Sequence, residues 1–134
     1  MKALDTNVLV RYYVQDEPRQ AATAARIMSE EAALFVPKTV ILELEWVLRG
    51  YYQQPSADIH AAVSHLSGLP NVIIEQADVV EAAVRHYRRG IDFADALHLA
   101  ASHACSELLT FDDRGYARRA AKLGLKPPVR IPAT

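Results

Sequence analysis

Short apolar runs alternate with longer amphipathic segments along this chain. The apolar runs cover residues 2–4, 34–36, 71–74, 107–110 and 129–131. Most of these runs are continuous, which is typical of strands in a parallel sheet that helices cover on both faces. The longer segments predict helices over residues 6–14, 18–29, 37–50, 56–68, 78–90, 93–104 and 116–123. The pattern therefore predicts an α/β fold with a mostly parallel central sheet.

Several residues mark where these helices are expected to begin. Pro18 and Pro37 suit the first turn of a helix, where a missing N–H costs nothing. Ser56, Asp78 and Asp92 are expected to be N-caps, because their side chains accept hydrogen bonds from the first backbone N–H groups. No linker, repeat or low-complexity segment interrupts the alternation. Residues 1–134 are therefore predicted to form a single domain.

The composition fits an ordinary globular domain. The chain has 134 residues, of which 51% are hydrophobic and 23% are charged. No apolar run approaches the ~18 residues that a membrane-spanning helix needs, and Asp5 stands where a signal peptide would be apolar. Cys105 is the single cysteine, so no internal disulfide can form, and we expect a buried thiol. These features fit a cytoplasmic protein with no membrane association.

The net charge does not exclude a nucleic-acid substrate. Fifteen Lys and Arg face sixteen Asp and Glu, a balance of −1. If four carboxylates bind metal, the remaining 12 acids face 15 basic residues, a balance of +3. The basic residues also gather late in the chain, at Arg85, Arg88, Arg89, Arg114, Arg118, Arg119, Lys122, Lys126 and Arg130. Solvated helix faces explain such a distribution equally well.

Two aspartates follow predicted strands. Asp5 comes after the strand at residues 2–4, and Asp112 comes after the strand at residues 107–110. Ligands of parallel α/β folds bind outside the carboxyl ends of the strands, so polar residues there are candidates for chemistry. Each also has a structural explanation, Asp5 as an N-cap and Asp112 as a turn residue. Asp113 is expected to face solvent or to pair with Arg114.

Helical geometry separates two glutamates of the segment 37–50. With 3.6 residues per turn, the apolar stripe is centred on Val40, Leu44 and Val47. Glu43 then falls at the edge of this stripe among apolar neighbours, where a carboxylate is costly unless it is paired or bound to metal. Glu45 falls on the opposite edge and can pair with Arg49 at the surface. We therefore expect a functional role for Glu43 and none for Glu45.

A nearly apolar helix carries one polar stripe. Within residues 93–104, Asp95, His98 and Ser102 share a face, and apolar residues surround them. A helix that is apolar nearly all round is buried, so this stripe must face something polar. Asp92 is explained as the N-cap, whereas Asp95 has less reason to be there. His98 could be a zinc ligand, but a histidine in this position is more often a polar neighbour of the acid or a core polar group.

These acids form a set that points to a metal site. Asp5, Glu43, Asp95 and Asp112 lie at places that a parallel α/β fold can bring to one edge of its sheet. Carboxylates packed together repel one another and raise their own pKa values. A hard divalent cation removes this repulsion, and oxygen-only ligands suit Mg²⁺ or Mn²⁺.

The residues also match a known family over nearly the whole chain. The matching stretches are Leu4-Asp5-Thr6-Asn7-Val8-Leu9-Val10, Val40 to Leu48 around Glu43, Asp92-Phe93-Ala94-Asp95-Ala96-Leu97-His98, and Leu109-Thr110-Phe111-Asp112. In this order and spacing they resemble the PIN-domain nucleases, and more narrowly the VapC-type ribonuclease toxins of prokaryotic toxin–antitoxin pairs. The resemblance implies a three-layer α/β/α sandwich with an acidic pocket.

The resemblance assigns roles to particular residues. Asp5, Glu43, Asp95 and Asp112 match the metal-binding and catalytic acids of the family, and Asp92 matches a position that is often acidic. Asn7 and Thr110 match polar residues that typically orient the acids. Asp113 departs from the pattern, because a second adjacent acid leaves two candidates for the fourth position. Three arginines are candidates for holding the RNA backbone: Arg11, Arg114 and Arg118.

The implied activity is hydrolysis of RNA phosphodiester bonds with Mg²⁺ or Mn²⁺. The implied partners are an RNA substrate, a VapB-type antitoxin and a second copy of the chain in a homodimer. Two alternatives keep the fold: a PIN nuclease of housekeeping RNA processing, and a catalytically silent module that binds RNA or protein. A phosphatase of the haloacid-dehalogenase type would need a second Asp two positions after Asp5, where this chain has Asn7.

Overall fold

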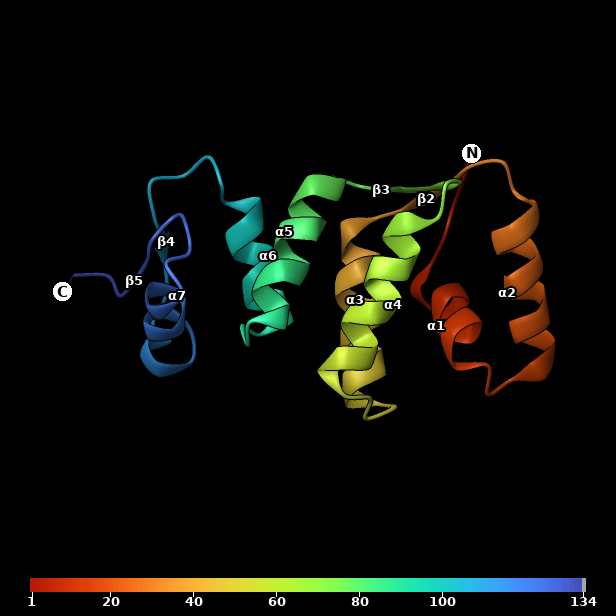
Figure 1. Cartoon of the computed structure of the whole chain (residues 1–134), viewed down its shortest axis with the longest axis horizontal. Coiled ribbons are helices and arrows are strands. Elements are labelled where there is room, and N and C mark those ends of the chain that lie inside the picture. Colours follow the sequence, from red (N-terminus) through yellow and green to blue (C-terminus); the bar gives the residue numbers. More distant parts are fainter. Residues whose placement is uncertain (134) are drawn as a thin grey trace. The chain divides into compact units, whose positions relative to one another are not determined.

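The computed structural model describes residues 1–133, whose contacts divide into two compact units (Figure 1). The first unit comprises Met1–Ala77 and the second comprises Asp78–Thr134. Each unit combines helices with strands that pair in parallel. The predicted α/β class with parallel strands is therefore confirmed.

The first unit is built on a three-stranded parallel sheet. Its strands are β1 (Lys2–Ala3), β2 (Leu34–Val36) and β3 (Val72–Ile74), in the order β1-β2-β3. Leu34 of β2 pairs with Lys2 of β1 and with Val72 of β3. Because the strands are parallel, the segments that follow them all leave from the same edge of the sheet. Asp5 follows β1 at this edge, and Glu75 follows β3.

Four helices accompany this sheet. They are α1 (Thr6–Val14), α2 (Pro18–Glu30), α3 (Lys38–Gly50) and α4 (Ser56–Gly68). α1 packs against α2 and α3, and α3 packs against α4 (Figure 1). The side chains that are least exposed in this unit come from all these layers and include Leu9, Leu34, Val36, Ile41, Leu44, Leu48, Ile59 and Leu66. The apolar positions expected from the sequence therefore form the core that holds α1 and α3 in place.

A carboxylate that follows the neighbouring strand β3 caps α3. Pro37 precedes this helix and makes no side-chain cap. Glu75, at the exit of β3, instead accepts a hydrogen bond of 2.9 Å from the backbone N of Lys38. Helix N-termini favour acceptors and negative charge because their first N–H groups lack partners. This contact fixes the start of the helix that carries Glu43.

From Ala77, the last residue of the first unit, to residue 133 the structure has three α-helices, one π-helical turn and two short strands. These are α5 (Ala77–Arg88), α6 (Phe93–Ala101), β4 (Leu108–Leu109), the turn η1 (Asp113–Ala117), α7 (Arg118–Lys122) and β5 (Val129–Arg130). β4 and β5 are parallel, with Leu108 opposite Val129. Gly90, between α5 and α6, has a φ of +98°, which glycine adopts far more readily than other residues. The rings of Tyr87 and Phe93 meet edge to face at 5.2 Å across this turn.

Some expected boundaries differ from the structure. Ser56 is the first residue of α4, not its N-cap, and Asp78 lies inside α5. α6 ends at Ala101, three residues early, and the expected helix over 116–123 begins as a π-turn at Asp113. Cys105 lies in the turn after α6 and is exposed, so the expected buried thiol is wrong. Among the described residues, no helix is long and apolar enough to cross a membrane.

Asn71 offers a test of how the first unit is held together. Its side-chain amide donates to the carbonyl oxygens of Met28 at 2.9 Å and Glu31 at 3.0 Å, which fastens the end of α2 to the start of β3. We expect Asn71→Ala to lower the free energy of unfolding by about 1–2 kcal/mol, because both bonds are lost. Urea unfolding followed by circular dichroism measures this, with exposed Ser64→Ala as the control. Equal stability of the two variants would contradict the role of this amide.

Candidate active site

Asp5 occupies the start of α1. It is the N-cap of this helix, and its Oδ1 accepts a hydrogen bond of 2.8 Å from the backbone N of Thr6. The expected capping role is therefore confirmed. The cap uses one carboxylate oxygen and holds the side chain in a fixed orientation at the sheet edge, where the carboxylate remains exposed. Capping and a role in chemistry are thus compatible in the same side chain.

Glu43 of α3 is hydrogen-bonded to Thr6, the residue that follows Asp5. Thr6 Oγ1 donates to Glu43 Oε1 at 2.5 Å, and the Thr6 side chain is almost fully buried at 5% exposure. Asp5 and Glu43 line the same cleft, which has a volume of about 260 Å³. The other lining residues are Thr6, Asn7, Val10, Arg11, Val47, Tyr51 and Tyr52. The structure thus brings the two predicted acids of the first unit together.

Thr6 is a site residue that the sequence argument missed. The resemblance gave the orienting role to Asn7, which lines the cleft and is exposed. The structure gives the direct contact with a carboxylate to Thr6, one position earlier. The sequence shows only that Thr6 follows the predicted N-cap Asp5 at the start of α1. The partner, 37 positions away, could not be read from the sequence.

Glu43 was expected among apolar neighbours and Glu45 at the surface, but the structure shows the reverse. Glu45 is buried at 2% exposure, whereas Glu43 is exposed. The reason is the buried face of α3, which comprises Val40, Ile41, Leu44, Glu45 and Leu48. This face is rotated relative to the stripe expected from the apolar residues alone. The predicted pair with Arg49 does form, at 2.8 Å, so Glu45 is a buried carboxylate with a cationic partner.

The second unit holds its own group of carboxylates. Asp92 is the N-cap of α6 as expected, and its Oδ2 accepts a hydrogen bond of 3.2 Å from the backbone N of Asp95. Desolvation raises the pKa of Asp95 above its ordinary value, and the negative charges of Asp92 and Asp112 raise it further. His98 acts in the opposite direction. The ionised form of Asp95 is therefore disfavoured in the protein without metal.

Asp112 is the N-cap of the π-turn η1. Its Oδ1 accepts a hydrogen bond of 2.9 Å from the backbone N of Gly115, and its own N–H donates to Thr110 Oγ1 at 3.0 Å. Thr110 therefore orients the backbone of Asp112 and not its carboxylate. A Cβ atom at position 115 would lie 2.7 Å from Asp112 Oδ2, so only glycine leaves room for this carboxylate.

The geometry distinguishes Asp112 from its neighbour Asp113. Asp113 was expected to face solvent or to pair with Arg114. Its side chain is 47% exposed, which confirms the first expectation, and its ion pair of 2.8 Å is with Arg118 and not with Arg114. One turn of helix separates the two partners, whereas adjacent side chains point in different directions. The carboxylate of Asp113 thus has a cationic partner at the surface. Arg114 is exposed.

Tyr116 is a second residue that the sequence argument missed. Its ring is buried at 3% exposure, and its hydroxyl donates to the backbone oxygen of Asp95 at 2.8 Å. Burial and the charges of Asp95 and Asp92 raise the pKa of Tyr116, so the hydroxyl stays protonated and remains a donor. The contact fastens η1 to the first turn of α6. It links the segments that carry Asp112 and Asp95.

The donor set of the candidate site fits a hard divalent cation. The four predicted acids appear as two pairs, Asp5 with Glu43 in the first unit and Asp95 with Asp112 in the second. All their donors are oxygen atoms, which Mg²⁺ and Mn²⁺ prefer. Within residues 1–133, no three Asp, Glu, His or Cys side chains form a cluster that could hold a metal ion. The structure therefore brings the predicted acids together only as pairs, and the four-acid metal site stays a prediction.

Comparison with known proteins gives a family and similar solved structures. The family model of the PIN domain matches residues 2–123. The crystal structure of Mycobacterium tuberculosis VapC20, described as a sarcin-ricin loop cleaving toxin, is similar to this chain with 22% sequence identity and a TM-score of 0.44. The alignment covers 93% of this chain and 96% of that one. Among curated proteins, no match is found.

The raised pKa of Asp95 gives a pH-dependent prediction. Because its pKa is higher in the folded than in the unfolded protein, the ionised carboxylate costs stability above that pKa, and the cost is lost as the pH falls through it. We expect Asp95→Asn to melt at a higher temperature than the wild type at pH 7 in EDTA. The difference should shrink near pH 4, around the ordinary pKa of aspartate. Asp113→Asn, which breaks an ion pair, is the control, and a lower melting temperature for Asp95→Asn at pH 7 would contradict the argument.

Proposed function

Because this chain belongs to the PIN-domain family, we propose that it is a ribonuclease that hydrolyses RNA phosphodiester bonds with Mg²⁺ or Mn²⁺. The observation that carries the proposal is the shared cleft of Asp5 and Glu43, which Thr6 joins. Two carboxylates that line one cleft can both supply oxygen ligands to a hard divalent cation. A surface that only binds RNA would have no use for them, since they repel phosphate.

The proposed ligands are the four predicted acids. Asp5 and Glu43 of the first unit, and Asp95 and Asp112 of the second, would hold the metal, with Asp92 assisting. The family match runs from residue 2 to residue 123 and so includes all four acids. We therefore propose that the two units act as one PIN domain. The ion pair of Asp113 with Arg118 supports Asp112 as the fourth acid.

These acids would hold the metal, which would supply a bound water of lowered pKa and positive charge beside the phosphate. The chain itself supplies fixed oxygen ligands. Thr6 keeps Glu43 in one orientation, and the backbone N–H groups at the start of α1 and η1 do the same for Asp5 and Asp112. No side chain is proposed as a covalent nucleophile, so the attacking group is water.

The biological role follows from the resemblance to VapC-type toxins. We propose that the protein is the toxin of a VapBC-type pair in the cytoplasm, that it forms a homodimer, and that a VapB-type antitoxin holds it inactive. The acidic cleft of Asp5 and Glu43 favours cationic groups, so a basic side chain of an antitoxin would fit there. An antitoxin gene immediately adjacent to the gene of this protein would support the role. Its absence would favour a nuclease of housekeeping RNA processing.

The test of the activity is cleavage of total cellular RNA by the purified protein with Mn²⁺, with Mg²⁺ and with EDTA. We expect discrete fragments with metal and none with EDTA. Asp5→Asn should lower kcat/KM at least about a hundredfold, since even partners outside the ligand shell cost 10- to 100-fold. Asparagine caps helices as well as aspartate does, so the fold of this variant should be intact.

The matched control for this test is Asp113→Asn, which removes the acid next to Asp112 and leaves the proposed ligands in place. Mn²⁺ should also raise the melting temperature of the wild type, because it binds the folded protein alone. Full activity of Asp5→Asn would refute the site. A folded wild type that cleaves no RNA with either metal would instead favour the silent binding module.

Gly115→Ala tests the assignment of Asp112. The added Cβ would lie 2.7 Å from Asp112 Oδ2, so the carboxylate has to move. We expect kcat/KM to fall by about 10- to 100-fold, the usual effect of disturbing the support of a metal ligand. Gly68→Ala is the control, because a Cβ there meets nothing within 4 Å. Unchanged cleavage by Gly115→Ala would point to an acid other than Asp112.

A further inference from the structure

Arg11 is the cationic residue of the cleft that holds Asp5 and Glu43. It lies on α1, and it also lines a second cleft of about 400 Å³ between α1 and α2. The two clefts share Asn7 and Arg11. A strand of RNA whose scissile phosphate lies at the acids would therefore pass Arg11 on its way to the second cleft.

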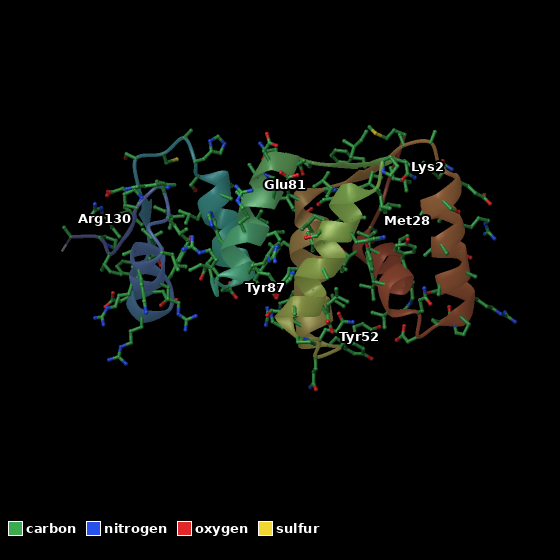
Figure 2. The ribbon with its side chains drawn as sticks, in the orientation of Figure 1. Lys2, Met28, Tyr52, Glu81, Tyr87 and Arg130 are labelled. Carbon is green, nitrogen blue, oxygen red and sulfur yellow. The ribbon has the colours of Figure 1, made fainter. Side chains whose placement is uncertain are left out.

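Three side chains from outside α1 hold this guanidinium in place. Its Nε donates to Gln20 Oε1 at 2.7 Å, and its Nη1 donates to Asp16 Oδ1 at 3.1 Å and to the Tyr52 hydroxyl at 3.3 Å. The Tyr52 hydroxyl in turn donates to Asp16 Oδ2 at 2.9 Å. Tyr52 lies just after α3 (Figure 2). The three partners come from three segments that the first unit brings together.

These hydrogen bonds come from Nε and Nη1 of Arg11 and do not involve Nη2. Arginine has five N–H donors, and the three bonds above occupy Nε and both hydrogens of Nη1. Among residues 1–133, no atom accepts a hydrogen bond from Nη2. The side chain is also 30% exposed, and its ion pair is with Asp16, not with Asp5 or Glu43. The cation is thus held rigidly with two donors available.

We propose that Arg11 binds a backbone phosphate next to the scissile bond, and that Asp16, Gln20 and Tyr52 are positioning residues that aim it. The proposal rests on the proposed ribonuclease function. A guanidinium held in its binding geometry before the substrate arrives loses less conformational entropy on binding. Phosphate prefers arginine because its planar N–H groups match phosphate oxygens.

A purely structural clamp is the competing explanation. Arg11, Asp16 and Gln20 also fasten the turn between α1 and α2, and such a clamp needs no ligand. The two explanations differ in measurable ways. A phosphate contact makes RNA affinity depend on salt, and positioning makes the effect of Tyr52 depend on Arg11. A clamp changes stability but neither of these quantities.

The experiment measures binding of a short single-stranded RNA of mixed sequence in EDTA across a range of salt concentrations. We expect Arg11→Gln to reduce the slope of log affinity against log salt by about 0.7, the value for one phosphate contact with a single strand. Tyr52→Phe should weaken binding about two- to tenfold, as one lost hydrogen bond does. In the cleavage reaction Tyr52→Phe should raise KM more than it lowers kcat.

A double-mutant cycle decides the positioning role. In the Arg11→Gln background, Tyr52→Phe should have no further effect on affinity, because Tyr52 acts through Arg11. Tyr12→Phe on α1 is the matched control, since its hydroxyl makes no hydrogen bond within residues 1–133. Asp16→Asn replaces Tyr52→Phe in the cycle if the latter does not fold.

Additive effects of Arg11→Gln and Tyr52→Phe, or an unchanged salt slope in Arg11→Gln, would overturn the proposal. If the wild type cleaves RNA and shows either result, this inference alone fails. If the folded wild type neither binds nor cleaves RNA, the proposed function fails with it. The two failures are therefore distinguishable from one set of proteins.

Discussion

Helix N-termini need acceptors for their unpaired backbone N–H groups, and this constraint places most of the candidate site. Asp5 caps α1, Asp92 caps α6 and Asp112 caps η1. Each cap consumes one carboxylate oxygen and in return fixes the side chain on a rigid element. Asp5 and Asp112 also follow strands, so strand, cap and helix form one continuous unit around each of them. The acids are thus stationary before any ligand arrives, which a metal site requires.

Glu43 and Asp95 are not helix caps, and other contacts position them. Glu43 has no backbone to cap and depends on the hydroxyl of Thr6. Asp95 lies within the first turn of α6, and its pKa is raised by burial first and then by the negative charges of Asp92 and Asp112. Folding alone does not offset this cost. A bound cation would, so the proposed metal would be favoured by the same charges that destabilise the protein without it.

Much of the fold could be predicted from the sequence because its signals are local. Proline at the start of α2, continuous β-branched residues in β3 and Asp92 before α6 each act on their nearest neighbours. The exchange of Glu43 and Glu45 could not be predicted in this way. The buried face of α3 depends on which neighbours pack against it, and the apolar stripe alone set its centre about one position wrong. The π-turn of η1 was also missed; within it, Gly115 leaves room for the carboxylate of Asp112.

Arg11 shows the same limit at the site itself. The three arginines Arg11, Arg114 and Arg118 were equal candidates for RNA contact, since the sequence shows their charge but not the ion pairs and hydrogen bonds that each forms. Arg11 and Arg118 are each paired with an aspartate, so pairing does not distinguish them. Place does, because Arg11 lines the cleft of Asp5 and Glu43, whereas Arg114 and Arg118 belong to the second unit. Of the contacts that orient Arg11, the one from farthest along the chain comes from Tyr52, 41 positions later. Tyr52 follows α3, the helix that carries Glu43, so the packing of α1 against α3 that joins Glu43 to Thr6 also brings Tyr52 to Arg11. The proposed metal ligand Glu43 and the proposed phosphate ligand Arg11 therefore depend on one interface, and we expect a change that loosens α1 against α3 to disturb both.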